Sequence, residues 1–174
     1  MADISQLLGA MINYYNGDPR RIQHFIKVHD LARTIGTLEG LDEHTLFTLE
    51  AAAAVHDIGI HICELTYGRC DGKLQEQEGP ALARDMLSAL DFDDEVIDRV
   101  CWLVGHHHTY SSIDTVDHQI LVEADFLVNL YEDGTPKEAI QSAYDKIFVT
   151  ETGKLFCQKM FGLNVGQSDS SNAQ

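Results

Sequence analysis

Four residues of types that bind divalent metals, two histidines and two aspartates, occur where helices are expected to bury them. His56 and Asp57 are adjacent, His24 precedes them and Asp125 follows. Imidazole nitrogens and carboxylate oxygens are common ligands of zinc and similar ions. For one such residue alone, a hydrogen-bonded core position is the ordinary explanation. Together, the four predict a metal site formed by His24, His56, Asp57 and Asp125.

The position of His24 on its helix indicates that its side chain points into the core. His29, five residues later, is displaced by about 140° and is expected at the edge of this face or in solvent. One band, roughly 80° wide, contains His24 and the apolar residues Val28, Leu31, Ile35 and Leu38.

The helix that leads to the dyad places His56 on a similar face. Leu46, Leu49, Ala53 and His56 follow one another at intervals of three, four and three, which is typical of one buried helical face. Asp57 comes directly after it. Gly59 then allows the backbone to turn freely, so the dyad forms a compact pair of ligands.

Asp125 shares a helical face with Leu121 and Val128, at intervals of four and three. Burying an ionised carboxylate without a partner costs several kcal/mol. The segment 100–130 contains no lysine or arginine. A metal ion shared with the inward histidines would satisfy this acid.

Three consecutive histidines, His106, His107 and His108, follow Gly105 at the expected end of a helix. Such a group could bind a second metal or donate hydrogen bonds to a phosphoryl group. A solvated surface cluster is the ordinary alternative. The spacing leaves these possibilities open.

The elements that position these residues are expected to be helices, because apolar residues recur at intervals of three and four and only three prolines occur. Asp18 and Asp42 are expected N-caps, with Pro19 at a first helical position. We expect one domain over residues 1–165, with an irregular loop over 60–77 and a disordered polar tail over 166–174. The expected helices cover residues 4–15, 19–39, 43–57, 80–90, 94–104, 119–131, 136–148 and 151–161.

The composition restricts the partners. The chain has 174 residues, of which 44% are hydrophobic, enough for one sizeable core. Its 28 acidic and 12 basic residues give a formal charge of -16, which would repel nucleic acid and anionic lipid. We therefore expect neither as a partner, and an anionic small substrate needs a local cation such as a bound metal.

The absence of a basic and apolar leader, and of any apolar run of about 20 residues, predicts a cytoplasmic protein. The four cysteines show no CxxC spacing. We expect them to be reduced structural thiols. They are Cys63, Cys70, Cys101 and Cys157.

The ordered set resembles the HD superfamily of metal-dependent phosphohydrolases, whose pattern is an early histidine, a His-Asp dyad and a late aspartate. Here these are His24, His56-Asp57 within Ala54-Val55-His56-Asp57-Ile58-Gly59, and Asp125. The resemblance covers roughly residues 20–131. It implies a five-helix core with extra helices at both ends. It also implies that the four residues bind a divalent ion that polarises a phosphoryl oxygen and activates a water.

The resemblance also bears on a second metal ion. Members with two metals usually supply further histidines between the dyad and the late aspartate, and His106 or His107 matches the later of these. Gln75 stands where such relatives often carry the earlier histidine, and an amide is a poor substitute for imidazole. One ion is therefore expected and a second remains open; the metal is Mn, Co, Ni, Zn, Mg or Fe.

Other residues are expected to assist the reaction. His61, four residues after Asp57, is a candidate for proton transfer, with an exposed loop position as the equal alternative. His107 could contact the substrate phosphate. The cations expected near an anionic substrate are Arg21, Lys73 and Arg84.

Three functions follow from this reading. The first is a phosphohydrolase for a small phosphate ester or nucleotide, with Asp57 and His61 in catalysis. The second is a two-iron oxygenase of the same superfamily, against which Gln75 argues. The third is a non-catalytic regulatory module with a structural metal. A homodimer is a possible assembly.

Overall fold

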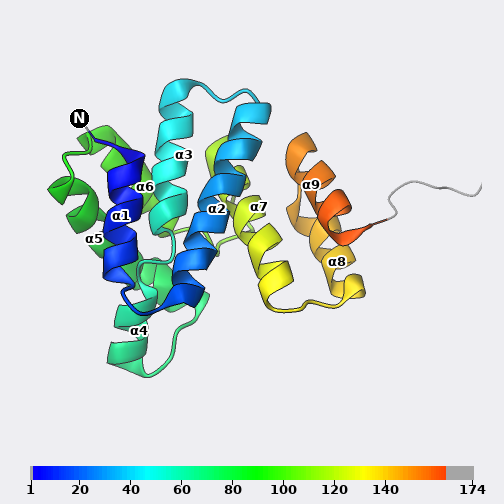
Figure 1. The fold of residues 1–174 in the computed structure, drawn as a ribbon. Coiled ribbons are helices and arrows are strands. Elements are labelled where there is room, and N and C mark those ends of the chain that lie inside the picture. The colour runs from blue at the N-terminus through cyan, green and yellow to red at the C-terminus, as the bar shows by residue number, and fades with distance from the viewer. Residues whose placement is uncertain (1, 164–174) are drawn as a thin grey trace, which may run out of the picture.

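The computed structural model describes residues 2–163, which form nine helices and no strand (Figure 1). The all-α prediction is confirmed. The predicted tail over 166–174 lies outside the described residues. The helices are α1 (Ile4–Tyr14), α2 (Pro19–Leu38), α3 (Glu43–Val55), α4 (Ile60–Tyr67), α5 (Gly72–Ala89), α6 (Asp94–Val104), α7 (Val116–Glu132), α8 (Lys137–Ile147) and α9 (Glu151–Phe161).

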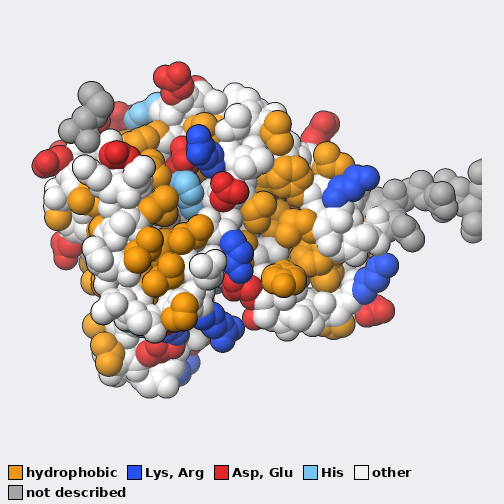
Figure 2. Space-filling model, in the orientation of Figure 1, with side chains coloured by type: hydrophobic (Ala, Val, Ile, Leu, Met, Phe, Trp, Pro, Cys, Tyr) orange, Lys and Arg blue, Asp and Glu red, His pale blue; other side chains and the backbone are white. Residues whose placement is uncertain are grey.

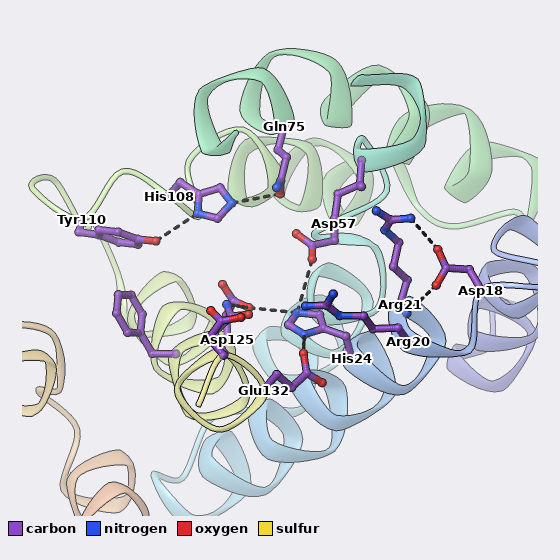
Figure 3. A pocket seen from close by; sticks show the side chains of 14 residues that line it. Asp18, Arg20, Arg21, His24, Asp57, Gln75, His108, Tyr110, Asp125 and Glu132 are labelled. Carbon is purple, nitrogen blue, oxygen red and sulfur yellow. Dashed lines mark hydrogen bonds and ion pairs between the residues drawn. The ribbon is translucent and has the colours of Figure 1, made fainter. Parts of the chain in front are cut away.

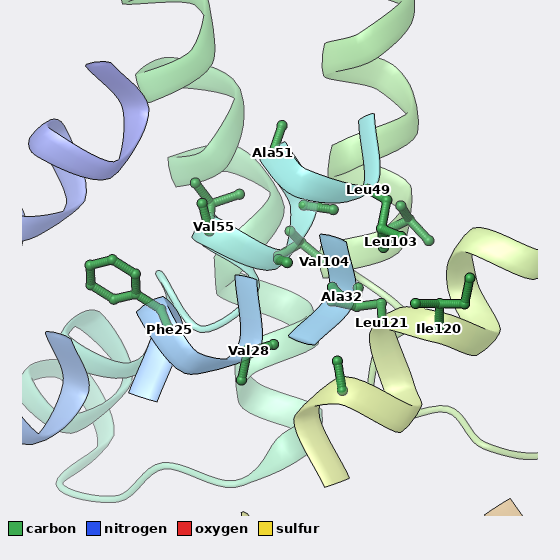
Figure 4. Packing of buried hydrophobic residues seen from close by; sticks show 14 of the residues in the cluster. Phe25, Val28, Ala32, Leu49, Ala51, Val55, Leu103, Val104, Ile120 and Leu121 are labelled. Atoms are coloured by element: carbon green, nitrogen blue, oxygen red, sulfur yellow. The ribbon is translucent and has the colours of Figure 1, made fainter. Parts of the chain in front are cut away.

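Helix α3 is the centre of the fold. It packs against α1, α2, α6 and α7, and its alanine block, residues 51–54, is fully buried. A helical segment that is apolar on all sides, as this alanine block is, belongs in a core, and its small side chains let the surrounding helices approach closely. Figure 4 shows part of the resulting core, to which α2 contributes Phe25, α3 Val55, α6 Val104 and α7 Leu121.

The predicted helix starts are confirmed at two caps. The Asp18 carboxylate accepts a hydrogen bond from the Arg21 backbone nitrogen at 3.1 Å, and Asp42 accepts one from Thr45 at 3.0 Å. Pro19 occupies the first turn of α2, where a missing N–H costs nothing. These caps fix the register of the two helices that carry His24 and His56.

The loop predicted over residues 60–77 is wrong, because the segment contains α4 and the first turn of α5. Asp71 caps α5 by accepting a hydrogen bond from the Leu74 nitrogen at 3.1 Å. Pro80, expected to begin a helix, lies inside α5. Because glycine and proline are typical of loops and helix starts, Gly72 and Pro80 led to the prediction of a loop followed by a shorter helix, where the structure has the single helix α5.

For α2, the structure decides one open expectation and contradicts another: His29 lies at the edge of the buried face and not in solvent, and Leu38 is not in the core. His29 is only 8% exposed, and its Nε2 lies 3.0 Å from Glu50 Oε1 of α3. Leu38, expected in the core, is 63% exposed because α2 ends there. The apolar face of α2 therefore extends to His29, where α3 supplies a carboxylate that single-helix geometry cannot reveal.

Helices α8 and α9 lie beyond α7, away from α1 (Figure 1). Their connection is held by Glu123 of α7, a fully buried carboxylate. It accepts hydrogen bonds from the Val149 nitrogen at 2.6 Å and the Thr150 nitrogen at 2.9 Å, and also from Gln119. Glu123 thus fixes the start of α9.

An apolar groove lies between α2, α7 and α9, where Figure 2 shows hydrophobic side chains gathered.

One helical stretch, Glu43–Tyr67, is long and apolar enough to cross a membrane, with a mean hydropathy of 1.3. Within this stretch, 61% of the most hydrophobic 18-residue segment is buried inside the fold. It is a core helix and does not indicate a membrane protein.

Candidate metal centre

Three helices bring the four predicted metal-binding residues together (Figure 3). His24 comes from α2, His56 ends α3 with Asp57 directly after it, and Asp125 comes from α7. His24 Nε2 lies 3.3 Å from His56 Nε2, 3.4 Å from Asp57 Oδ2 and 3.2 Å from Asp125 Oδ1. His56 Nε2 lies 3.5 Å from each of the same two carboxylate oxygens.

These separations fit a single divalent ion. Atoms bound about 2.1 Å from one ion lie about 3.0 to 3.4 Å from each other, close to the observed distances. By ligand type and distance, His24, His56 and Asp57 could hold a metal ion. Asp125 Oδ1 faces both imidazoles and is oriented by a 2.8 Å hydrogen bond from Asn129.

The far nitrogen of each ring is already engaged. His24 Nδ1 lies 2.8 Å from Glu132 Oε2, and His56 Nδ1 lies 2.8 Å from the Ala53 carbonyl oxygen. Both acceptors favour a proton on Nδ1, which leaves Nε2 free as a ligand. Such outer partners are usual for metal-bound histidines. Glu132 was not predicted, although its spacing of seven from Asp125 on α7 places it on the same face.

The charges at this centre are strongly coupled. Burial acts to lower the pKa of His56, but the carboxylates of Asp57 and Asp125 raise it to about 9. Burial acts to raise the pKa of Asp57, but His56 and His107 lower it to about 2. The donor set therefore attracts positive charge, which a divalent ion would supply.

The backbone of the dyad is held from two sides. The Tyr15 hydroxyl donates to the Asp57 carbonyl oxygen at 2.6 Å, and the Tyr14 hydroxyl donates to that of Ile58 at 3.1 Å. On the other side, a Cβ added to Gly59 would lie 3.0 Å from the Gly79 nitrogen. Gly59 has a φ of -73°, so close approach to α5, and not free turning, requires a glycine.

A second group of potential ligands shares Asp57. It consists of Asp57, His107 and His108. His107 is fully buried, and its Nε2 has no hydrogen-bond partner among the described residues but lies 3.5 Å from Asp57 Oδ1. Its Nδ1 is engaged by the Val104 carbonyl oxygen at 2.8 Å. His107 therefore repeats the arrangement of His56.

His108 is placed by α5. Its Nε2 lies 3.1 Å from Gln75 Oε1, while its backbone nitrogen donates to Glu76 Oε1 at 2.9 Å. A Cβ on Gly72 would lie 2.7 Å from His108 Cγ, so the glycine makes room for the ring. Burial, and then His107, lower the pKa of His108 to about 4. Gln75, predicted to weaken a second site, thus contacts one of its histidines.

His106 does not join either group, contrary to its predicted role as a metal ligand. Its ring stacks on Trp102 with centroids 4.1 Å apart, and its Nδ1 lies 2.7 Å from the Trp102 carbonyl oxygen. The turn after α6 directs His107 and His108, and not His106, towards Asp57. Adjacent positions in a turn point in different directions, and the spacing alone could not choose among them.

A pocket of about 670 Å³ opens onto the centre and exposes His24, Asp57 and Asp125. Of the predicted substrate-binding cations, only Arg21 lines it, and its guanidinium pairs with Asp18 and Glu64 at 2.6 Å each. Lys73 is exposed elsewhere. Arg84 pairs with Asp98 on the surface.

Arg20 is the cation that the prediction missed. It lines the same pocket as His24 (Figure 3), and it forms no ion pair within residues 2–163. Its neighbour Arg21 was preferred because sequence alone cannot tell which of two adjacent guanidiniums is already paired. In the first turn of α2, Arg20 is exposed, whereas Arg21 is paired with Asp18 and Glu64.

His61 is not brought together with the metal ligands. Its ring packs against Tyr15, with centroids 4.5 Å apart, and its Nε2 lies 3.6 Å from Asp18 Oδ2. Ile60, its neighbour, lines the pocket, but His61 does not. The predicted role in proton transfer has no support from this geometry, because α4 turns the imidazole towards α1.

The fold and the donor set define a helical protein whose metal ligands follow the order His, His-Asp, Asp. The model of the HD domain matches residues 21–144. The chain therefore belongs to the HD-domain family, and the predicted resemblance is confirmed.

A solved structure supports the same fold. It is a predicted HD superfamily hydrolase from an uncultured Thermotogales bacterium, with a TM-score of 0.66 and 24% identity over 91% of this chain and 84% of that chain. No curated protein matches the sequence significantly.

Proposed function

We propose that the protein is a metal-dependent phosphohydrolase that acts on a small phosphate ester. The observation that carries this proposal is that His24 Nε2 and His56 Nε2 lie 3.3 Å apart, and that each lies 3.2 to 3.5 Å from one oxygen of Asp57 and one oxygen of Asp125. In this reaction the oxygen of a water forms a bond to phosphorus, the ester P–O bond breaks, and the alcohol leaves with a proton.

The charge of the pocket explains why metal is needed. Its lining has five carboxylates and two arginines, an excess of three negative charges. A phosphate ester would be repelled from such a surface. One divalent ion leaves the lining slightly negative, whereas a second ion at Asp57, His107 and His108 makes it positive. We therefore propose two ions per chain during turnover.

The residues around the metal centre have different roles in the proposed reaction. Bound divalent metal supplies Lewis acidity and lowers the pKa of water. Glu132 holds the ring of His24 in place, and Tyr15 holds the backbone of Asp57. Arg20, with no ion-pair partner within residues 2–163, binds a phosphoryl oxygen at the pocket mouth.

The open pocket favours an enzyme over a structural metal site, because structural sites usually have closed ligand shells. The two-iron oxygenase remains a competing chemistry for the second group. Elemental analysis of anaerobically purified protein separates these functions when combined with phosphate release and oxygen uptake. Two irons with oxygen consumption and no phosphatase activity would contradict the proposal.

The direct test is Asp57→Ala, with Asp30→Ala on the exposed side of α2 as the matched control. We expect the first variant to lose bound metal and phosphate-ester turnover, and the control to keep both. Circular dichroism checks that both variants are folded. Retained metal and unchanged turnover in folded Asp57→Ala would overturn the assignment.

A further inference from the structure

One wall of the metal pocket is aromatic, although most of its lining is charged. Tyr110 and Phe126 line the pocket, with ring centroids 5.1 Å apart and an interplanar angle of 69°. Figure 3 shows Tyr110 across the pocket from Arg20 and Arg21. The pocket therefore has a cationic side and an aromatic side, with the metal ligands between them.

The aromatic wall is held in place yet remains open to a ligand. Tyr110 is 40% exposed, and its hydroxyl lies 3.1 Å from His108 Nδ1. Phe126 directly follows the ligand Asp125 and is only partly buried. Burying such rings in the core would give greater apolar stabilisation. Their position beside the metal ligands instead presents a fixed apolar surface to whatever is attached to a bound phosphoryl group.

The geometry of this wall fits a planar ring. Two aromatic rings in an edge-to-face arrangement can accept a third ring through the same edge and face contacts. Stacking of a nucleic-acid base on an aromatic side chain improves affinity by roughly five- to 150-fold. The hydroxyls of an aliphatic alcohol gain no hydrogen bonds from ring carbons.

We propose that Tyr110, backed by Phe126, determines specificity by binding a planar ring on the leaving group of the phosphate ester. This inference rests on the proposed function and narrows its substrate class to esters of ring-bearing alcohols. The ring is either a phenolic ring or a nucleobase. Its alcohol leaves when water oxygen bonds to phosphorus and the ester P–O bond breaks.

Turnover gives the first test, with metal-loaded protein. The substrates are phenyl phosphate, a purine nucleoside monophosphate and glycerol phosphate. We expect the wild type to prefer one or both ring-bearing esters, measured as kcat/KM relative to glycerol phosphate, and Tyr110→Leu to lose about tenfold of that preference. Preference for phenyl phosphate indicates a phenolic ring, and preference for the nucleotide indicates a base.

Three further variants separate the ring from other effects. Tyr110→Phe keeps the ring but loses the hydroxyl contact with His108, so it should retain the preference. If Tyr110→Leu does not fold, Phe126→Leu takes its place as the test variant and should reduce the preference for ring-bearing esters. Tyr131→Leu removes a tyrosine that is 71% exposed outside the pocket, and should leave the preference unchanged.

Binding gives a test that does not depend on hydrolysis. Calorimetry of phenylphosphonate and methylphosphonate, which have no ester bond to break, should show tighter binding of the phenyl compound to the wild type and not to Tyr110→Leu. Ring-dependent binding without turnover supports this inference and contradicts the hydrolase. Turnover without any ring preference overturns the inference and leaves the hydrolase standing. Binding without any ring preference likewise overturns the inference. Equal binding losses for both phosphonates would also overturn it.

Discussion

Glu132 Oε2 lies 2.8 Å from Nδ1 of His24, on the opposite side of the ring from the nitrogen that faces Asp125. Lys27 contacts the other oxygen of Glu132 at 2.5 Å. The carboxylate is therefore fixed, and it fixes the imidazole in turn. We therefore expect metal affinity at this centre to depend on Glu132, which contacts His24 Nδ1 and not the side of the ring that faces Asp125.

Replacing Glu132 should weaken metal binding without abolishing it. For Glu132→Gln we expect a loss of about 10- to 100-fold in affinity, because outer partners orient metal-bound histidines and increase their basicity. Competition with a chromogenic chelator measures the change. Glu95→Gln, at a side chain that is 85% exposed, should bind as the wild type does. Equal affinities in the two variants would show that Glu132 does not position His24.

The close approach of Gly59 to α5 leads to a prediction about stability and metal affinity. Gly59→Ala should destabilise the protein by about 1 to 3 kcal/mol, as overpacking does, and should lower metal affinity because the dyad must shift. Gly9, inside α1, has no neighbouring atom within 4 Å of an added Cβ. Gly9→Ala should therefore stabilise the protein by up to about 1 kcal/mol. Urea unfolding with and without metal measures both variants.

Arg20 should act on substrate and not on metal. For Arg20→Met we expect KM for the phosphate ester to rise about tenfold, the equivalent of one charged hydrogen bond, while metal content stays at the wild-type level. Arg69→Met, at a side chain that is 71% exposed, is the matched control. Loss of metal from Arg20→Met would instead indicate a structural role.

The sequence predicted the metal centre better than its surroundings. Helical phase predicts that His24, His56 and Asp125 point into the interior, and Asp57 directly follows His56 at the end of α3. Residues that act across helices were missed: Glu132 meets His24 only when α7 packs against α2. The sequence does not reveal that Arg20 lines the pocket beside Arg21, or that His108 and not His106 lies near Asp57, because ion pairing and turn geometry distinguish such neighbours.

Replacing Glu123 tests whether its hydrogen bonds to the connection between α8 and α9 stabilise the fold. Glu123→Ala leaves two backbone donors without their acceptor: the buried nitrogen of Thr150 and the part-buried nitrogen of Val149. We expect a loss of about 3 kcal/mol or more in unfolding free energy, since unsatisfied buried groups cost about 1 to 3 kcal/mol each. Glu138→Ala, on the exposed face of α8, should change stability by less than about 0.5 kcal/mol. A similarly small effect at Glu123 would exclude it as an anchor.

The ion pairs of Arg99 should make stability depend on acid pH. Hydrogen bonds from Arg99 lower the pKa of Asp114 to about 2, from an ordinary value of 3.8. Because the pKa is depressed in the folded state, this stabilisation is fully present above about pH 4 and is lost as the pH falls to about 2. Urea unfolding between pH 6 and pH 2 measures it. Asp114→Asn should show a shallower decline over this window, and an unchanged decline would contradict the assignment.

The hydrogen bonds from Tyr14 and Tyr15 to the dyad backbone mean that the functional unit is larger than the family match. That match begins at residue 21, whereas both tyrosines precede it, and Tyr15 is almost fully buried. A chain trimmed to the matched region would keep every metal ligand and lose the hydroxyls that hold Asp57 and Ile58. Boundaries drawn from shared sequence would then yield a protein with a complete set of ligands and a loosened active site.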